Sequence, residues 1–299
     1  MSLFRTQPVA SATASGEIRD GEHTLKRALT AHHLVMLGIG AVIGAGIFVM
    51  TGNAAANYAG PAVILSFVMA GVACAFAGLC YAEFAAMLPV SGSAYSYTYA
   101  TLGEIVAWFI GWMLILEYTF AAATVAVGWS GYFVGLLESI GAAFGTTLSL
   151  PESLTNAPLT VINGRPVLTG ALVNLPAVAI VIAVAALCYR GITQSATVNA
   201  IIVLIKVGVI LLFIAVTLQH VNPDNWTPFI PEPEGPGRFG FDGVVRGASV
   251  VFFAYIGFDA VSTAAQEAKN PQRDMPIGIL GSLFICTLIY IAMSAVMTG

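Results

Sequence analysis

The sequence predicts an all-α integral membrane protein whose helices cross the bilayer several times. Of its 299 residues, 58% are apolar and 9% are charged, and the mean hydropathy is +0.87. In soluble domains about a quarter of the residues are charged. This composition excludes a disordered chain, a nucleic-acid-binding protein and an ordinary soluble enzyme. The four cysteines lie inside apolar runs and show no disulfide or zinc pattern, so neither a metal nor a cofactor is expected.

Seven apolar runs are each long enough to cross about 30 Å of hydrocarbon as a helix. Strands are not expected in them, because apolar residues do not alternate as they do in a membrane barrel. The third run is longer than a span requires, so this helix should tilt or protrude. The predicted spans are 34–52, 62–88, 105–137, 170–189, 198–219, 243–265 and 276–298.

A polar tail precedes the first span, and basic residues predict that this tail is cytosolic. Residues 1–33 should be mostly disordered before Thr24, and no cleavable signal peptide is apparent, because the first apolar run is too long for one. Cytosolic segments are enriched in Lys and Arg. With the N-terminus inside, more basic residues lie on the cytosolic side than outside. They are Arg5, Arg19, Lys26, Arg27, Arg190, Lys269 and Arg273, against Arg165, Arg238 and Arg246.

Three loops have distinctive compositions. The outer loops 138–169 and 220–242 are rich in proline and should be irregular, because proline removes a backbone donor. The first of them contains the turn dipeptide Asn163-Gly164. The inner loop 89–104 is rich in hydroxyls and tyrosines and has no basic residue. A short interfacial helix is predicted there, with its tyrosines at headgroup depth.

The first span contains four glycines in nine residues, Gly38, Gly40, Gly44 and Gly46. Glycine disfavours a helix by close to 1 kcal/mol relative to alanine. One interpretation is close helix packing through a GxxxG pair. The other is a helix broken at 44–46, roughly 15 Å deep at 1.5 Å per residue, where the second half-helix attracts an anion. The glycines alone do not decide between these two interpretations.

The sixth span favours the broken-helix interpretation. It carries Gly257 at mid-span, followed two residues later by the carboxylate of Asp259. A charged residue at this depth is costly and indicates function. Interrupted first and sixth helices are typical of an inverted repeat of five helices. Carbonyls near Phe253 and Ile256 would then bind an ammonium while the first helix binds a carboxylate. The ligand implied is a zwitterion, a free amino acid.

Charged residues within the spans are few. Glu83 lies near the inner end of the second span and should reach the interface. Glu117 is roughly 18 Å deep at 1.5 Å per residue, too deep to reach water. Lys206 is roughly 12 Å deep on the same rise. It can snorkel to the interface, or it can face the bundle, where a buried amine can gain and lose a proton.

At these residues the sequence resembles the amino acid–polyamine–organocation superfamily, and within it the cationic amino acid transporter branch in its bacterial form. The resemblance runs from about Leu25 to the last residue. It is carried by five stretches in the same order. They are GIGAVIGAGIF (38–48), SGSAYSY (91–97), WFIGWMLILEY (108–118), FFAYIGFD (252–259) and EAKNPQRDMP (267–276).

The resemblance implies a leucine-transporter-like fold of two inverted five-helix repeats plus two further helices. In a transmembrane domain 34–299, the first repeat would occupy 34–219 and the second would begin in 243–298. The implied function is secondary active, proton-coupled uptake of amino acids across the plasma (inner) membrane, with no enzymatic activity. The implied partners are a free amino acid, a proton and the lipid bilayer, with no nucleic acid.

The resemblance also implies the site. The substrate-binding residues would be Val42, Ile43, Gly44, Ala45, Gly46, Glu117, Phe253, Ala254, Ile256 and Asp259. The N–H groups of 44–46 would bind the substrate carboxylate, and carbonyls of Val42, Phe253 and Ile256 its ammonium. Phe253 would also close over the substrate from outside. Lys206 would be the proton-coupling residue, its ammonium replacing the sodium of sodium-coupled relatives.

The sequence leaves alternatives open for the substrate class and for the coupling ion. Glu117 and Asp259 would line the side-chain end of the pocket and favour a cationic side chain by Coulomb attraction, whereas small neutral amino acids are the other option. A sodium-coupled or exchange-type amino acid or polyamine transporter of the same fold is a rival, although Lys206 would repel sodium. A seven-span receptor is a distant rival, because its N-terminus would face outward. Family members have twelve or more helices, so the sequence is interpreted as a fragment or truncated product.

Overall fold

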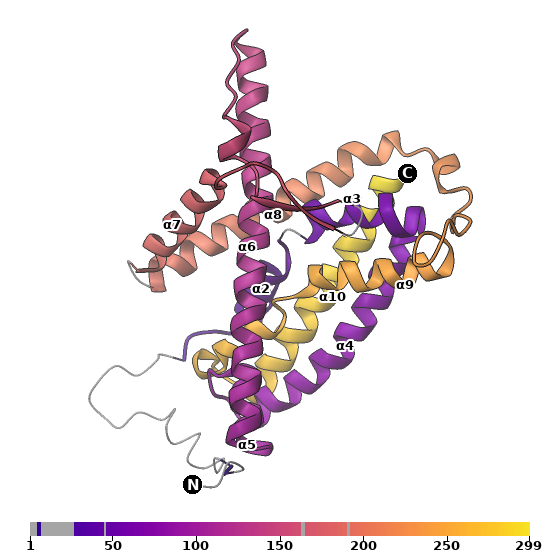
Figure 1. Ribbon diagram of the computed structural model, residues 1–299. Coiled ribbons are helices and arrows are strands. Elements are labelled where there is room, and N and C mark those ends of the chain that lie inside the picture. The colour runs from indigo at the N-terminus through magenta and orange to yellow at the C-terminus, as the bar shows by residue number, and fades with distance from the viewer. Residues whose placement is uncertain (1–4, 7–26, 45, 163–164, 190–191) are drawn as a thin grey trace. The chain divides into compact units, whose positions relative to one another are not determined.

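Helices form nearly all of the regular structure in the computed structural model, which describes residues 5–6, 27–44, 46–162, 165–189 and 192–299 (Figure 1). Five helical stretches of this described part are long and apolar enough to cross a membrane, and two shorter apolar helices accompany them. The prediction of an all-α, multi-pass membrane protein is therefore confirmed. The five are Gly46–Met87, Glu104–Ala143, Ile201–His220, Gly240–Glu267 and Pro271–Thr298, and the shorter two are Ala31–Val42 and Leu175–Tyr189.

The chain folds into two units. Unit 1 comprises Met1–Ile115 and Asn199–Gly299, and unit 2 comprises Leu116–Val198. The helix α6, Glu104–Ala143, begins in unit 1 and continues in unit 2. Its 40 residues extend roughly 60 Å at 1.5 Å per residue, about twice what the hydrocarbon requires. The expectation that this span is unusually long is confirmed, although its helix ends six residues beyond the predicted Leu137.

The first span of unit 1 is helical on both sides of an interruption. It starts earlier and ends later than the predicted 34–52, because Thr30 caps the first helix and the first positive φ after the interruption is at Gly60 (+58°), next to Pro61. The elements are α2 (Ala31–Val42), η1 (Gly46–Met50), α3 (Thr51–Ala54), η2 (Ala55–Ala59) and η3 (Gly60–Ala62), followed by α4 (Val63–Met87). Most of the predicted tail, residues 1–4 and 7–26, lies outside the described residues.

The inner loop 89–104 contains the predicted short helix, α5 (Ser93–Thr101). Its tyrosines do not share one environment. Tyr95 is exposed, whereas Tyr97 is buried, stacked on Phe84 of α4 and packed edge-on against Tyr81. Tyr97 is therefore part of the protein core of unit 1, because α5 turns one side towards α4.

The sequence from Asn199 onward supplies the rest of unit 1, and the first turns of its helix α8 (Ile192–Thr217) belong to unit 2. The seventh span starts five residues before the predicted Pro276, since Pro271 occupies the first helical position, where a missing N–H is no loss. The loop 220–242 is largely irregular, as predicted, with two short 3₁₀ turns. The elements are α8 (Ile192–Thr217), η5 (Leu218–His220), η6 (Pro223–Trp226), α9 (Gly240–Val251), η7 (Phe252–Tyr255), η8 (Asp259–Glu267) and α10 (Pro271–Thr298).

The core of unit 1 is built around α10, which lies beside α4 and also packs against α2 (Figure 1). Three aromatic rings meet at its centre, those of Phe67 on α4, Tyr255 on η7 and Tyr290 on α10. The hydroxyl of Tyr255 donates to the carbonyl of Phe67 at 3.0 Å. Phe67, Tyr255 and Tyr290 are all fully buried, so this aromatic cluster links the second, sixth and seventh spans.

The expectation that the outer loop 138–169 is irregular is wrong for part of this loop, which lies in unit 2. It contains η4 (Glu152–Leu154) and an antiparallel pair of strands, β1 (Leu159–Ile162) and β2 (Arg165–Leu168). The sequence Asn-Gly favours a two-residue hairpin turn, although Asn163 and Gly164 themselves lie outside the described residues. The fourth predicted span begins later than 170, as α7 (Leu175–Tyr189), because the Asn174 side chain caps it by accepting from the Ala177 N–H.

Candidate functional site

The first span is interrupted where its glycines predicted. Helix α2 ends at Val42, Ile43 is extended (φ −73°, ψ 102°), and Gly44 lies in a bend. Helical structure resumes at Gly46 and continues through η1, α3 and η2 to Ala59. The helix-break interpretation of this span is therefore confirmed. The predicted residue Ala45 lies outside the described residues.

The sixth span is interrupted around its own glycine. The 3₁₀ turn η7 ends at Tyr255, Ile256 is extended (φ −55°, ψ 133°), and Gly257 has a φ of +110°. A non-glycine residue rarely adopts such a φ. The chain then continues as the 3₁₀ helix η8, which differs from the α-helix expected for the second half of this span.

The two interruptions lie against each other. A Cβ atom on Gly46 would overlap the backbone of Ala254. On the other side, a Cβ on Gly257 would lie 2.8 Å from the carbonyl oxygen of Ala41. Both glycines are therefore needed for close backbone approach, and they bring the end of α2 next to the end of η7.

Tyr290 connects the two interruptions directly. Its hydroxyl lies 2.9 Å from the carbonyl oxygen of Val42 and 2.8 Å from that of Ala254, and it donates to both. A tyrosine hydroxyl has one hydrogen, so this hydrogen is shared between the two acceptors. The side chain comes from the seventh span and is fully buried. Sequence reasoning missed this residue; its signal was a hydroxyl in the middle of an apolar span.

Lys206, on α8, also contacts the end of α2. Its Nζ donates to the carbonyl oxygens of Gly40 at 2.6 Å and of Ile43 at 2.7 Å. The side chain thus faces the interior of unit 1, and the snorkelling alternative is wrong for this lysine. Both hydrogen bonds are shorter than the usual N–H···O distance, as expected when the donor is charged.

Most backbone carbonyls at the end of α2 accept a hydrogen bond from another group. The carbonyl of Ile39 accepts from the Ile43 N–H at 3.0 Å. Those of Gly40 and Ile43 accept from Lys206, and that of Val42 accepts from Tyr290. An unpaired backbone group in hydrocarbon would cost several kcal/mol, so Lys206 and Tyr290 make the interruption of the first span tolerable.

The other predicted site residues are placed as follows. Asp259 is 4% exposed at the start of η8 and Phe253 is half-buried on η7. The Phe253 carbonyl, predicted to bind the ammonium, accepts from the Ile256 N–H at 3.2 Å. Glu117 belongs to unit 2, where it is half-buried on α6. Unit 1 thus brings together the residues 42–44, Gly46, 253–259 and Lys206.

Comparison with known proteins shows the family. The sequence profile described as amino acid permease matches residues 29–299. The chain belongs to the amino acid permease family. This family is part of the amino acid–polyamine–organocation superfamily, which confirms the resemblance deduced from the five sequence stretches. The interrupted first and sixth spans of unit 1 agree with the fold expected for this family.

The chain is similar to parts of transporters whose names give different substrates. It is 51% identical to the branched-chain amino acid permease BcaP of Bacillus subtilis and 49% identical to the methylthioribose transporter of the same organism, over 298 residues of each. It is 40% identical to the chloroplastic cationic amino acid transporter 9 of Arabidopsis thaliana over 301 residues. These alignments cover 100% of this chain but 59%, 59% and 50% of the respective relatives.

Proposed function

We propose that this permease is a secondary active transporter that takes up amino acids across the plasma membrane. The N-terminus lies in the cytosol, and uptake is coupled to protons. Family membership supports transport rather than an enzymatic activity. The observation that carries the proposal within the chain is the pairing of two interrupted spans, held together by Tyr290.

The interruptions suit the two charged ends of an amino acid. Helical structure that starts at Gly46 presents N–H groups and the positive end of a helix dipole, which attract a carboxylate. The ends of α2 and η7 present carbonyls and the negative end of the dipole, which attract an ammonium. Each carbonyl has two lone pairs, so those of Val42 and Phe253 can accept a second hydrogen bond from substrate.

Lys206 is the proposed proton-coupling residue. As an ammonium, it binds the carbonyls of Gly40 and Ile43 at the end of α2, where the first interruption begins. Loss of a proton would weaken both hydrogen bonds by about half, because charge-assisted bonds are roughly twice as strong as neutral ones. Protonation of Lys206 would therefore strengthen the hydrogen bonds that stabilise the end of α2. A sodium ion would compete for the same carbonyls and would be repelled by the ammonium, which disfavours the sodium-coupled alternative.

The substrate class is the finer part of the proposal. The buried carboxylate of Asp259 supports a cationic amino acid, whereas the 51% identical relative is named for branched-chain amino acids. A 49% identical relative is named for methylthioribose, which makes this sugar a second candidate substrate. We propose an amino acid, because the paired interruptions offer complementary sites for an ammonium and a carboxylate.

Uptake by the complete gene product in proteoliposomes tests the proposal. Radiolabelled arginine, alanine, leucine and methylthioribose are supplied separately under an imposed proton gradient, a sodium gradient or neither. Accumulation of an amino acid driven by protons alone is the expected result. Accumulation driven by sodium, or only in vesicles preloaded with amino acid, would replace proton coupling with the symport or exchange alternative. Uptake of methylthioribose without any amino acid would overturn the amino acid proposal.

A further inference from the structure

The start of α10 borders a basic cavity that the transport proposal does not use. This cavity of about 660 Å³ is lined by residues from three segments of unit 1. Its lining includes three cationic side chains, Arg27, Lys269 and Arg273, and no acidic one. All three are exposed, and among the described residues the ion pair that is found, Arg238 with Glu234, involves none of them.

Backbone hydrogen bonds hold two of these cations in place. The N–H groups of Ala28 and Leu29 both donate to the carbonyl of Glu267 at 2.9 Å, and the Lys269 N–H donates to the carbonyl of Leu29 at 2.8 Å. These bonds fix Arg27 beside Lys269, although the two residues are far apart in sequence. The nearby acid Asp274 is buried, accepts from the Asn270 N–H at 3.2 Å and does not belong to the cavity lining.

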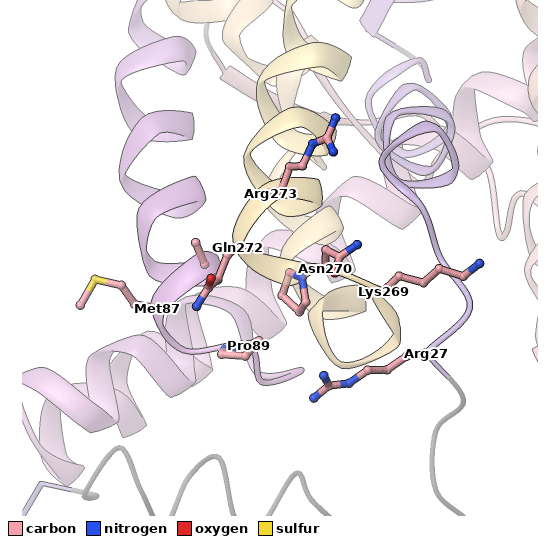
Figure 2. A pocket seen from close by; sticks show the side chains of 9 residues that line it. Arg27, Met87, Pro89, Lys269, Asn270, Gln272 and Arg273 are labelled. Atoms are coloured by element: carbon pink, nitrogen blue, oxygen red, sulfur yellow. The ribbon is translucent and has the colours of Figure 1, made fainter.

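The cationic groups are spread around the first turn of α10. Figure 2 shows Met87 and Pro89 on one side of this turn, Arg27 and Lys269 on the other, and Arg273 pointing along the helix. A large anionic group with several oxygens can contact more than one of these cations.

An apolar groove continues along the same pair of helices. It has a volume of about 380 Å³ and is lined by Val68, Gly71, Val72 and Ala75 of α4 and by Leu280, Leu283, Phe284, Thr287 and Ile291 of α10. From Arg273, the groove extends over roughly 10 to 27 Å along α10 at 1.5 Å per residue. This is the depth at which the acyl chains of a lipid lie when its headgroup is at the membrane surface.

We propose that the basic cavity and the apolar groove together bind an anionic phospholipid. The anionic headgroup lies among Arg27, Lys269 and Arg273, and an acyl chain lies in the apolar groove. The general enrichment of cations on one side of a membrane protein explains neither the absence of acids from the lining nor the groove on the same helices. With the proposed orientation, this lipid belongs to the cytosolic leaflet, where basic pockets between spans bind anionic headgroups.

Lipid binding is measured by native mass spectrometry of the purified complete gene product. Phosphatidylglycerol is added in one arm, phosphatidylcholine in the second, and inorganic phosphate in the third. Phosphatidylglycerol is expected to bind at least tenfold more tightly than phosphatidylcholine, and phosphate is expected not to bind detectably. Equal binding of the two lipids would overturn the proposal, and binding of phosphate as tight as that of phosphatidylglycerol would identify a simple anion site instead.

Two pairs of variants test the headgroup and the acyl chain separately. Lys269→Gln with Arg273→Gln should weaken phosphatidylglycerol binding by about 30-fold, since each basic residue near an anionic surface contributes roughly fivefold. The matched control, Arg238→Gln with Arg246→Gln, removes two cations from the opposite end and should leave binding unchanged. Ala75→Phe fills the groove and should weaken binding, whereas Ala73→Phe, exposed on α4 outside the groove, should not.

Losses of equal size in the test and control variants would overturn the site. Because the measurement reads lipid binding and not uptake, its result does not depend on the proposed transport activity. Thermal unfolding of each variant without added lipid checks that the fold is retained.

Discussion

Replacing Tyr290 by phenylalanine removes the hydrogen that joins the two interrupted spans and leaves the ring in place. The carbonyls of Val42 and Ala254 then lose their donor, at distances of 2.9 and 2.8 Å. Both residues are buried, with 3% and 2% exposure, so water does not easily replace the hydroxyl. One shared hydrogen bond with two buried acceptors corresponds to about 1–2 kcal/mol, the upper end of what polar contacts contribute between membrane helices.

The expected result is a loss of substrate affinity in addition to a loss of stability. If Tyr290 holds the interruptions in their binding arrangement, Tyr290→Phe should weaken amino acid binding by about tenfold, which corresponds to about 1.4 kcal/mol. Binding is measured by scintillation proximity with the purified complete gene product. Unfolding of the same protein is followed by thermal denaturation.

Tyr255→Phe is the matched control. Tyr255 belongs to the same aromatic cluster, and its hydroxyl donates to the carbonyl of Phe67 at 3.0 Å, which lies in the second span and not at an interruption of the first. This variant should lose similar stability while keeping most of its substrate affinity. If Tyr290→Phe and Tyr255→Phe lose affinity equally, or if neither loses any, Tyr290 only packs and does not position the site.

The remaining predictions concern three other residues of the site. Lys206→Ala should abolish the pH dependence of uptake while substrate binding survives better, because the proton carrier is lost and two carbonyls lose their donor; unchanged proton-driven accumulation would reject its coupling role. Asp259→Asn should weaken arginine binding by about 1–3 kcal/mol and leave alanine binding almost unchanged, whereas equal losses would mean that Asp259 does not select the substrate. Gly46→Ala should destabilise the protein by about 1–3 kcal/mol because its Cβ overlaps Ala254, while Gly208→Ala, with open space at its Cβ, should not; equal unfolding temperatures would contradict the close approach.

The interruptions could be predicted from sequence because their causes are local. Glycines at 44, 46 and 257 weaken the helix wherever they are placed, and a carboxylate at 259 marks the same depth in the sixth span. The element boundaries were less accessible. The helix α10 begins at Pro271, five residues before the predicted start at Pro276, because a proline at the first helical position sacrifices no hydrogen bond.

The partners of Lys206 and Tyr290 could not be predicted from sequence. Tyr290 and Val42 are separated by 248 positions, and Lys206 and Gly40 by 166, so only the packing of α8 and α10 against α2 brings them together. The depth of Lys206 followed from counting residues, but depth does not reveal which groups a side chain meets. The strands of unit 2 are a different case, since the Asn-Gly signal was present and the surrounding prolines outweighed it in the prediction.

An interrupted helix in a membrane creates a requirement elsewhere in the chain. Its released carbonyls must find donors, because lipid offers none, and here the donors come from the fifth and seventh spans. Any movement of α8 or α10 relative to α2 must therefore break hydrogen bonds to these carbonyls unless substrate, water or another side chain replaces them. An arriving ammonium group is such a replacement. If substrate binds as proposed, binding and rearrangement of the spans would be coupled through the same small set of carbonyls. Variants of Lys206 and Tyr290 should then change the rate of transport as well as affinity.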